Sequence, residues 1–174
     1  LLKLTFGGSG YDIACAKHNN PIQFSNLNNK ISVKEVSFDP VFKVNPPLRT
    51  PADIAALKEG LRDGTIDAIA TDHAPHASHL KEQPLDQAPP GMLGLETALA
   101  LSLSELDMEI QAVLAALSWN PARIAGIGDR HGRPIAVGEP ANIAIFDPTS
   151  EWVVDREAVA SKSKNTPYHG RRVR

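Results

Sequence analysis

A short apolar run followed at once by an acid and two histidines is the feature that most constrains this chain. Residues 66–70 read Ile-Asp-Ala-Ile-Ala, and Asp72, His73 and His76 come within the next six positions. Such a pattern is typical of a β/α barrel, where strands are buried and chemical groups lie at their C-terminal ends. Asp and His ligate divalent metals, so the segment predicts metal-assisted hydrolysis.

Each of these three side chains also has a structural interpretation. From its position, Asp72 is as well suited to capping the following turn as to binding a metal or moving a proton. His73 could ligate, orient a neighbour or pack. His76 lies further on and is expected to point elsewhere, which suits substrate contact better than a shared metal. One Asp and two His do not complete a hydrolytic metal site, so the segment is expected to be one wall of a larger site.

The chain alternates between short apolar runs and longer segments with helical spacing. Apolar runs predict strands at 22–24, 41–44 and 66–70. Helical spacing and caps predict helices at 9–19, 51–63, 93–106, 108–117 and 120–125. This alternation indicates an α/β fold with a parallel sheet and βα crossovers. A closed eight-fold barrel takes about 250 residues, so a chain of 174 residues is expected to supply only part of one.

The residue composition and the length of the apolar segments change near residue 128. Glycine and proline then punctuate short segments, and those at 142–147 and 151–154 read as strands. We therefore expect residues 1–128 to form a partial barrel and residues 129–174 a smaller β part. The Pro-rich stretch at 72–92 is expected to be a long loop.

Charge and cysteine content narrow the class of protein. The 18 basic and 20 acidic side chains nearly balance, so neither nucleic acid nor a membrane is an expected partner. The terminal arginines at 171, 172 and 174 are expected to lie in a solvated tail. Cys15 is the single cysteine, which excludes an internal disulfide framework and favours a reducing, cytoplasmic compartment. No apolar run reaches the ~18 residues that cross a bilayer.

Two further segments place polar or flexible residues just past apolar ones. Asn45 can donate and accept through its amide, which suits a cyclic imide or amide, and Arg49 can hold a carboxylate. An Asn-Pro turn and a surface Arg are the alternatives. Gly91 and Gly94 permit close backbone approach before a helix, although ordinary loop punctuation also explains them.

Three motifs follow one another along the chain. They are Val-Asn-Pro-Pro-Leu-Arg at 44–49, Ala-Thr-Asp-His-Ala-Pro-His at 70–76 and Pro-Gly-Met-Leu-Gly-Leu-Glu at 90–96. In this order they resemble dihydroorotase of the longer bacterial type, within the metal-dependent amidohydrolases. Hydantoinases and allantoinases share a shorter version of the middle motif, which is the most specific of the three. The similarity continues through 120–123, 140–147 and 161–168.

The resemblance implies a fold, a reaction and a set of residue roles. The fold would be the C-terminal part of a TIM-like (β/α) barrel, with residues 129–174 in the small β domain that flanks it. The reaction would be the zinc-dependent, reversible interconversion of dihydroorotate and N-carbamoyl-L-aspartate in pyrimidine synthesis, by a homo-oligomer when full length. By match, Asp72 would contact the metal and act as general acid/base. Asn45 and His76 would contact substrate, as would the backbone of Pro90 and Gly91.

Two positions depart from the family pattern. A metal-binding His is expected near the start, where this chain has Lys3, and the family's Thr-Pro-His-His stretch is replaced near residues 27–30. The family's His-x-His motif and its bridging metal ligands are expected upstream of Leu1. Two hypotheses follow. The chain is a C-terminal segment of a dihydroorotase that is active only when completed, or it is a catalytically silent scaffold partner of aspartate transcarbamoylase.

Overall fold

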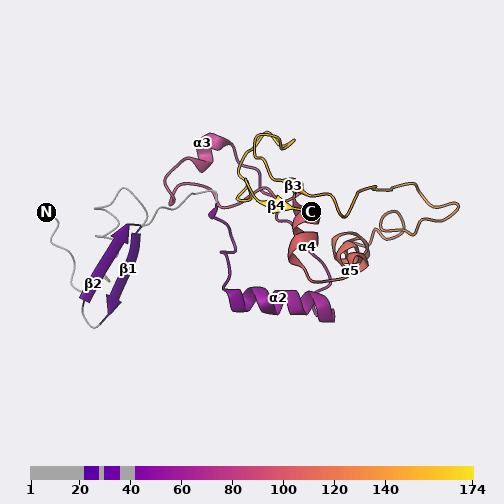
Figure 1. Cartoon of the computed structure of the whole chain (residues 1–174), viewed down its shortest axis with the longest axis horizontal. Coiled ribbons are helices and arrows are strands. Elements are labelled where there is room, and N and C mark those ends of the chain that lie inside the picture. The colour runs from indigo at the N-terminus through magenta and orange to yellow at the C-terminus, as the bar shows by residue number, and fades with distance from the viewer. Residues whose placement is uncertain (1–21, 28–29, 36–41) are drawn as a thin grey trace.

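The described part of the chain consists of short helices and two small sheets joined by long irregular segments (Figure 1). The computed structural model describes residues 22–27, 30–35 and 42–174, and the helix predicted at 9–19 lies outside them. The strands are β1 (Ile22–Leu27), β2 (Lys30–Glu35), β3 (Trp152–Val153) and β4 (Arg172–Val173). The helices are α2 (Pro51–Asp63), α3 (Ser78–Lys81), α4 (Ala98–Glu105), α5 (Ile110–Leu114), the π-helical η2 (Ala115–Trp119) and α6 (Asn120–Ile124).

Strands β1 and β2 form an antiparallel hairpin. The register runs from Ile22 opposite Glu35 to Leu27 opposite Lys30. The strand predicted at 22–24 is confirmed and is longer than expected. The sequence does not predict β2, because its surroundings are polar and Asn-rich and carry little periodic signal. Pairing with a partner strand can impose a strand where intrinsic preference is weak.

Helix α2 begins and ends at residues that the sequence marks for those roles. The Thr50 hydroxyl accepts from the Asp53 amide at 3.3 Å, and the Asp53 carboxylate accepts from the Thr50 amide at 3.1 Å, which forms a capping box. Pro51 occupies the first helical turn, where its missing amide hydrogen costs nothing. Gly64 ends the helix at φ 81°, a left-handed conformation that glycine adopts readily. The predicted helix at 51–63 is confirmed.

Replacing Thr50 with Ala should lower the free energy of unfolding at neutral pH by about 1 kcal/mol, because the Asp53 amide loses its acceptor. Hydrogen bonds from the Thr50 side chain and backbone hold the pKa of the Asp53 carboxyl below its ordinary value of 3.8. The Thr50 hydroxyl also donates to the Asp53 carboxylate at 2.8 Å, and the substitution removes this bond too. Because the folded-state pKa is lowered, the stabilisation from this second bond is present above pH 3.8 and is lost as the pH falls through the folded-state value. Urea unfolding of both proteins across this range measures the effect. An equal loss in acid and at neutral pH would contradict it, and Thr50→Ser should retain the cap.

The apolar run at 66–70 is irregular and forms no sheet ladder with described residues, so the predicted strand is wrong for this structure. Its backbone is held by single hydrogen bonds, such as that from the Ile69 amide to the Ala116 carbonyl at 2.9 Å. A parallel strand needs a neighbouring strand to complete its ladder. Among the described residues, this part of the chain has an isolated parallel bridge between His73 and Met92 instead.

The run at 41–44 is also irregular in its described part, and the buried strand predicted there is wrong. The Phe42 side chain is 42% exposed. The Lys43 carbonyl accepts from the Gly91 amide at 2.8 Å, which ties this segment to a loop rather than to a strand.

Helix α4 begins at Ala98, five residues later than predicted. The amides before it are used elsewhere: Leu93 donates to the Asn165 carbonyl, and Gly94 and Leu95 donate to a histidine ring. These long-range bonds occupy the amides of residues 93–95, so α4 begins only after the turn at 95–97. The helical prediction for 93–106 is therefore correct in its second half.

Elements α5, η2 and α6 follow one another without a break, close to the helices predicted at 108–117 and 120–125. The wider π turn ends at Trp119, two residues before Pro121, which has no amide hydrogen to continue α-helical bonding. Within the described ranges, none of the helices is long and apolar enough to cross a membrane.

A small core forms where the end of the chain meets α4. Strands β3 and β4 pair antiparallel, and Val154 and Val173 are 0% and 2% exposed. They pack with Ala100 of α4, and Leu101 and Tyr168 lie against this cluster. The strand predicted at 151–154 is confirmed over two of its residues.

Two of the three terminal arginines, Arg171 and Arg174, bind to α4, so the expected solvated tail is wrong for them, whereas Arg172 is exposed and pairs with Glu151. The Arg174 guanidinium donates twice to the Leu103 carbonyl, at 3.1 and 3.0 Å. Arg171 forms an ion pair with Glu105. Cations are favourable near a helix C-terminus, where backbone carbonyls lack partners.

The predicted strand at 142–147 is irregular and exposed. Its side chain at Ile145 is 94% exposed, and that of nearby Val137 is fully exposed. Figure 1 shows this orange stretch extending away from α5. No described strand lies beside it to complete a ladder, so the alternating apolar pattern has no sheet to join.

Candidate active site

Residues 71–76 and 90–95 lie side by side and form the centre of the candidate site. His73 and Met92 make the parallel bridge, and the Ala74 amide donates to the Met92 carbonyl at 2.9 Å. The structure therefore joins the second and third motifs, which are separated in sequence by a loop that contains α3. That loop was predicted as irregular over 72–92, and the short helix within it is an addition.

Two glycines make this close approach possible. A Cβ atom on Gly91 would lie 2.6 Å from Cβ of Ala74 and 2.8 Å from Nε2 of His76. A Cβ atom on Gly94 would lie 2.7 Å from the carbonyl oxygen of Thr71. Gly91 also has a φ of 136°, which residues with side chains rarely adopt. Close backbone approach, rather than loop punctuation alone, therefore explains both glycines.

The His76 ring contacts the backbone of the neighbouring segment. Its Nε2 lies 2.9 Å from the Pro90 carbonyl oxygen. A carbonyl can only accept, so Nε2 carries the hydrogen and donates it. In the neutral ring Nδ1 is then an acceptor, and it makes no hydrogen bond to a described residue. His76 and Pro90, both predicted to contact substrate, are in contact with each other.

Asp72 lies between the apolar run and the bridge, in an unusual backbone conformation. Its φ is 45°, in the left-handed region, which Asp tolerates better than most residues. The residue is exposed, and its carboxylate accepts no hydrogen bond from a described residue. The alternative that Asp72 caps the following turn therefore has no bond to support it. A strained and exposed acid next to the bridge between His73 and Met92 is a candidate for function.

His73 has a structural role. Its Nδ1 accepts from the Gly94 amide at 3.1 Å and from the Leu95 amide at 3.3 Å. Both bonds require an unprotonated Nδ1, so the hydrogen of the neutral ring is on Nε2. Of the three interpretations left open by sequence, the structure supports orientation of a neighbour.

Asn45 is not hydrogen-bonded into the network that joins the two paired segments. It is exposed, and its side chain makes no hydrogen bond to a described residue. Lys43, two residues earlier, both accepts and donates hydrogen bonds with the 85–91 loop. Its carbonyl accepts from the Gly91 amide, and its Nζ donates to the Leu85 carbonyl at 2.6 Å. Arg49 is also exposed, and the carboxylate that it could hold stays a prediction.

Lys81 is a buried residue of this network that sequence reasoning missed. It is 7% exposed, and its Nζ donates to the carbonyls of Pro89 at 3.0 Å, Gly91 at 3.1 Å and Lys43 at 3.4 Å. Burial of a lysine is costly unless its donors are satisfied. Lys81 thus holds Lys43, the residue before the first motif, next to the third motif.

The segment near the end of the chain also reaches the site. The Glu96 carboxylate, in the third motif, accepts from the amides of Ala160 at 2.8 Å and Ser161 at 3.1 Å. These bonds hold the pKa of the Glu96 carboxyl below its ordinary value of 4.5. Asn165, which is buried, bonds both paired segments. The one sequence signal for this was the resemblance at 161–168, which gave no role to these residues.

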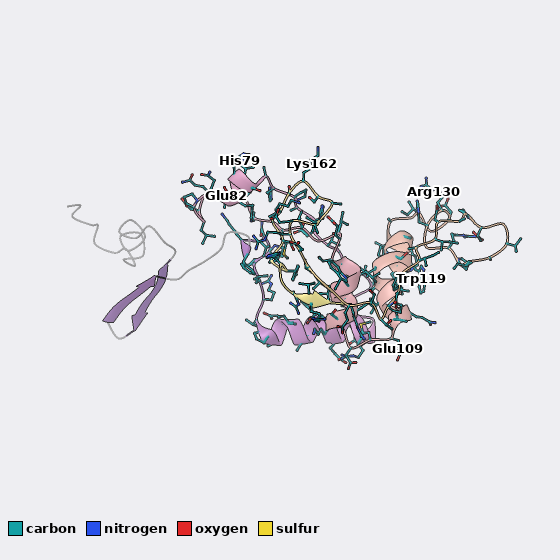
Figure 2. The ribbon with its side chains drawn as sticks, turned by 45° about the horizontal axis from the view of Figure 1, so that its top comes forward. His79, Glu82, Glu109, Trp119, Arg130 and Lys162 are labelled. Carbon is teal, nitrogen blue, oxygen red and sulfur yellow. The ribbon has the colours of Figure 1, made fainter. Side chains whose placement is uncertain are left out.

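The described residues do not fit a complete metal centre. Among them, no group of three or more His, Cys, Asp or Glu side chains comes together. Asp72 is a candidate ligand, but one nitrogen of His73 and one of His76 are engaged by backbone groups. His79 is exposed on α3, toward the outer edge of the molecule (Figure 2).

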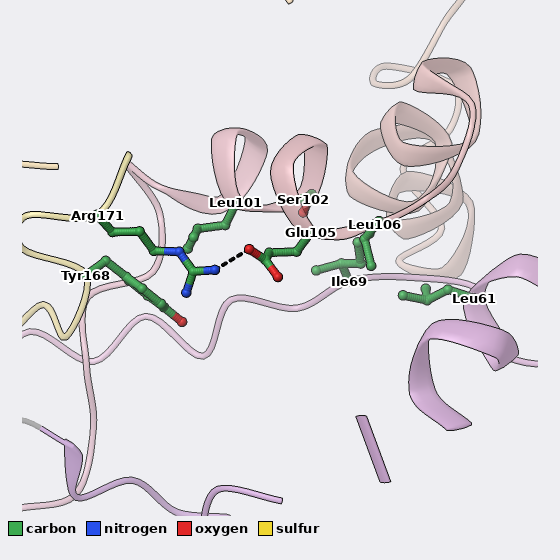
Figure 3. Close-up of a pocket in the computed structure, with 8 residues that line it drawn as sticks. All are labelled: Leu61, Ile69, Leu101, Ser102, Glu105, Leu106, Tyr168 and Arg171. Carbon is green, nitrogen blue, oxygen red and sulfur yellow. Dashed lines mark hydrogen bonds and ion pairs between the residues drawn. The ribbon is translucent and has the colours of Figure 1, made fainter. Parts of the chain in front are cut away.

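An open, mostly apolar cleft lies outside the candidate site. It has a volume of about 280 Å³ and lies between α2, α4 and the end of the chain (Figure 3). Ile69 and Leu101 contribute to its walls, and the ion pair of Arg171 with Glu105 crosses it. None of the predicted site residues lines it, so it is no guide to the chemistry.

Comparisons with known proteins show to which protein family the chain belongs. The model of the amidohydrolase family matches residues 14–170. The chain therefore belongs to the amidohydrolase family. It is similar to the dihydroorotase of Mycobacterium leprae (strain TN), with 50% identity over 136 residues, 76% of this chain and 31% of the relative. It is also similar to the dihydroorotase of Streptomyces coelicolor, with 47% identity over 139 residues, 78% of this chain and 32% of the relative.

These relatives confirm the resemblance drawn from the motifs, and nothing in the comparisons favours the silent scaffold. The chain spans about a third of the length of these curated relatives, at 31% and 32%. Activity, substrate and partners are therefore matters for proposal.

Solved structures of hydantoinases share the fold. The D-hydantoinase (dihydropyrimidinase) from Thermus sp. aligns with a TM-score of 0.69 at 24% identity, covering 77% of this chain and 31% of that one. A D-hydantoinase from Bacillus sp. AR9 aligns with a TM-score of 0.64 at 25% identity, with the same coverage. With the family match, they imply a TIM-barrel-type fold, as predicted. The boundary near residue 128 and the flanking β domain stay predictions.

Proposed function

We propose that this chain is part of a dihydroorotase, a hydrolase that interconverts dihydroorotate and N-carbamoyl-L-aspartate in pyrimidine biosynthesis. The observation that carries the proposal is the pairing of residues 71–76 with residues 90–95, which sets the His76 ring against Pro90 beside an exposed Asp72. Relatives named dihydroorotase at about half identity, 50% and 47%, support it.

In the proposed reaction, water adds to a ring amide carbonyl carbon, and the bond from that carbon to the ring nitrogen breaks. Asp72 takes a proton from the attacking water and delivers it to the departing nitrogen, as a general base and then a general acid. Its exposed carboxylate, without a hydrogen-bonding partner among the described residues, is available for both transfers. His76 binds substrate through Nδ1, because Nε2 is held by the Pro90 carbonyl. Asn45 and the backbone of Gly91 complete this contact surface.

Zinc is the metal that this proposal implies, with Asp72 as the ligand that this chain supplies. The described donor set does not fit a complete centre, so the mechanism assigns no step to the ion. Homo-oligomerisation, association with aspartate transcarbamoylase and a cytoplasmic location stay predictions.

A hybrid enzyme tests the proposal. In it, the aligned 136-residue segment of the Mycobacterium leprae dihydroorotase is replaced by the matching residues of this chain. We expect the hybrid to bind zinc, measured by mass spectrometry, and to hydrolyse dihydroorotate. Hydrolysis of hydantoin without hydrolysis of dihydroorotate would contradict the proposed substrate. The 174-residue chain is the control. Stoichiometric zinc with turnover in this control would contradict the incomplete donor set.

A further inference from the structure

Asn165 connects the two paired segments from a position near the end of the chain. Its side-chain Nδ2 donates to the carbonyls of Ala74 at 2.9 Å and Gly91 at 3.2 Å. Its Oδ1 accepts from the His76 amide at 3.2 Å. Its own carbonyl accepts from the Leu93 amide at 3.1 Å. A single residue therefore bonds the backbone on both sides of the contact between His76 and Pro90.

Burial makes these bonds consequential. Asn165 is 4% exposed, so water does not readily replace a lost partner. A carboxamide has two N–H donors and one acceptor oxygen, and here both donors and the oxygen are used. A fully satisfied buried polar network fixes one geometry, whereas removal of a member leaves its partners unpaired.

We propose that Asn165 is a positioning residue that sets the separation between His76 and the Pro90–Gly91 backbone, and so shapes the substrate-binding surface. The inference rests on the proposed function, because substrate contact by His76 and Gly91 is part of it. Asn165 does not touch the substrate. Lys81 also donates to the Gly91 carbonyl, at 3.1 Å, so that group keeps a partner when Asn165 is replaced. What is lost is the link to residues 74–76.

Thr166 offers a matched control. It is the next residue, it is 1% exposed, and its hydroxyl accepts from the Tyr168 amide at 3.3 Å within the same turn. Thr166→Val keeps the side-chain shape and removes a bond that does not reach the site. Asn165→Leu keeps a similar volume and removes three bonds that do.

Hydrogen exchange of single amides, measured by NMR in the 174-residue chain, tests the link without any activity. The Ala74 amide donates to Met92 and not to Asn165, so it reports on the pairing of the two segments. Asn165→Leu should speed exchange at both Ala74 and His76 by about tenfold or more. Thr166→Val should leave both rates unchanged. Equal effects of the two variants, or unchanged exchange at Ala74 in Asn165→Leu, would overturn the proposal.

Steady-state kinetics in the hybrid enzyme separate positioning from general stability. Asn165→Leu should raise KM for dihydroorotate by about tenfold with little change in kcat, because binding contacts rather than the reacting groups are displaced. Thr166→Val should change neither constant. An unchanged KM in Asn165→Leu, or a loss confined to kcat, would overturn the positioning role. A folded parent hybrid without dihydroorotate hydrolysis would count against the proposed function, while the exchange rates would still decide on Asn165.

Discussion

Replacing Asp72 with Asn in the hybrid enzyme should lower kcat for dihydroorotate on the order of 10³-fold, because a carboxamide cannot shuttle the proton. Stability should change little. Asp72 is exposed, and Asn tolerates a φ of 45° as readily as Asp does. Ala would be a poorer test, since it would add backbone strain of about 1 kcal/mol to any effect on the chemistry.

Asp67 provides the matched control for this substitution. It lies in the same irregular segment, is also exposed, and forms an ion pair with Arg123 at 3.3 Å. Asp67→Asn should leave kcat unchanged, because an exposed pair contributes little. Steady-state kinetics, thermal unfolding and zinc content would be measured for both variants. Near-normal turnover in Asp72→Asn would refute its assigned role, and an equal loss in Asp67→Asn would indicate a general effect of charge.

The parts of the fold that sequence predicts well are those that local bonds determine. Helix α2 is the clearest case, because Thr50, Pro51, Asp53 and Gly64 specify its two ends within a turn of each. The helices that follow are also found close to their predicted bounds, except where distant partners intervene. Helix capping can be predicted from sequence because the donor, the acceptor and the backbone conformation all belong to neighbouring residues.

Strands were harder, because a ladder depends on a partner that the run itself does not specify. The runs at 66–70 and 142–147 have strand-like patterns, yet no described strand lies beside them. Conversely, β2 pairs with β1 although its own sequence carries little signal. A pattern of alternating apolar residues indicates which face of a strand would be buried. It does not indicate whether a neighbouring strand is present to pair with it.

The same distinction applies to the candidate site. The motifs identified the residues that lie at its centre, including His76 and Gly91, because resemblance and turn chemistry are local signals. Lys81 and Asn165 are not predicted, since Lys81 has a hydrogen-bonding partner 38 residues away in sequence and Asn165 has one 91 residues away. A polar residue in a loop gives no sign of burial until those partners are known.

Gly91→Ala should be the most disruptive single substitution in the candidate site. The added Cβ would lie 2.6 Å from Cβ of Ala74 and 2.8 Å from Nε2 of His76, closer than such atoms approach. Ala74 cannot withdraw easily, because Asn165 binds its carbonyl. The His76 ring can turn away, but it then loses its hydrogen bond to the Pro90 carbonyl. Overpacking costs about 1–3 kcal/mol and an unfavourable φ about 1–2 kcal/mol more, so we expect a loss of roughly 3 kcal/mol in the free energy of unfolding.

Gly138 separates the two causes of that loss. Its φ is 89°, also in the positive region, but a Cβ atom there would meet nothing within 4 Å. Gly138→Ala should therefore show the backbone cost alone and leave KM unchanged. Gly91→Ala should be less stable than Gly138→Ala in urea unfolding and should raise KM for dihydroorotate, because the ring of His76 is pushed away from Pro90. Equal stability of the two variants would mean that the two segments do not require this close contact. The pairing would then not be what places the substrate-binding groups.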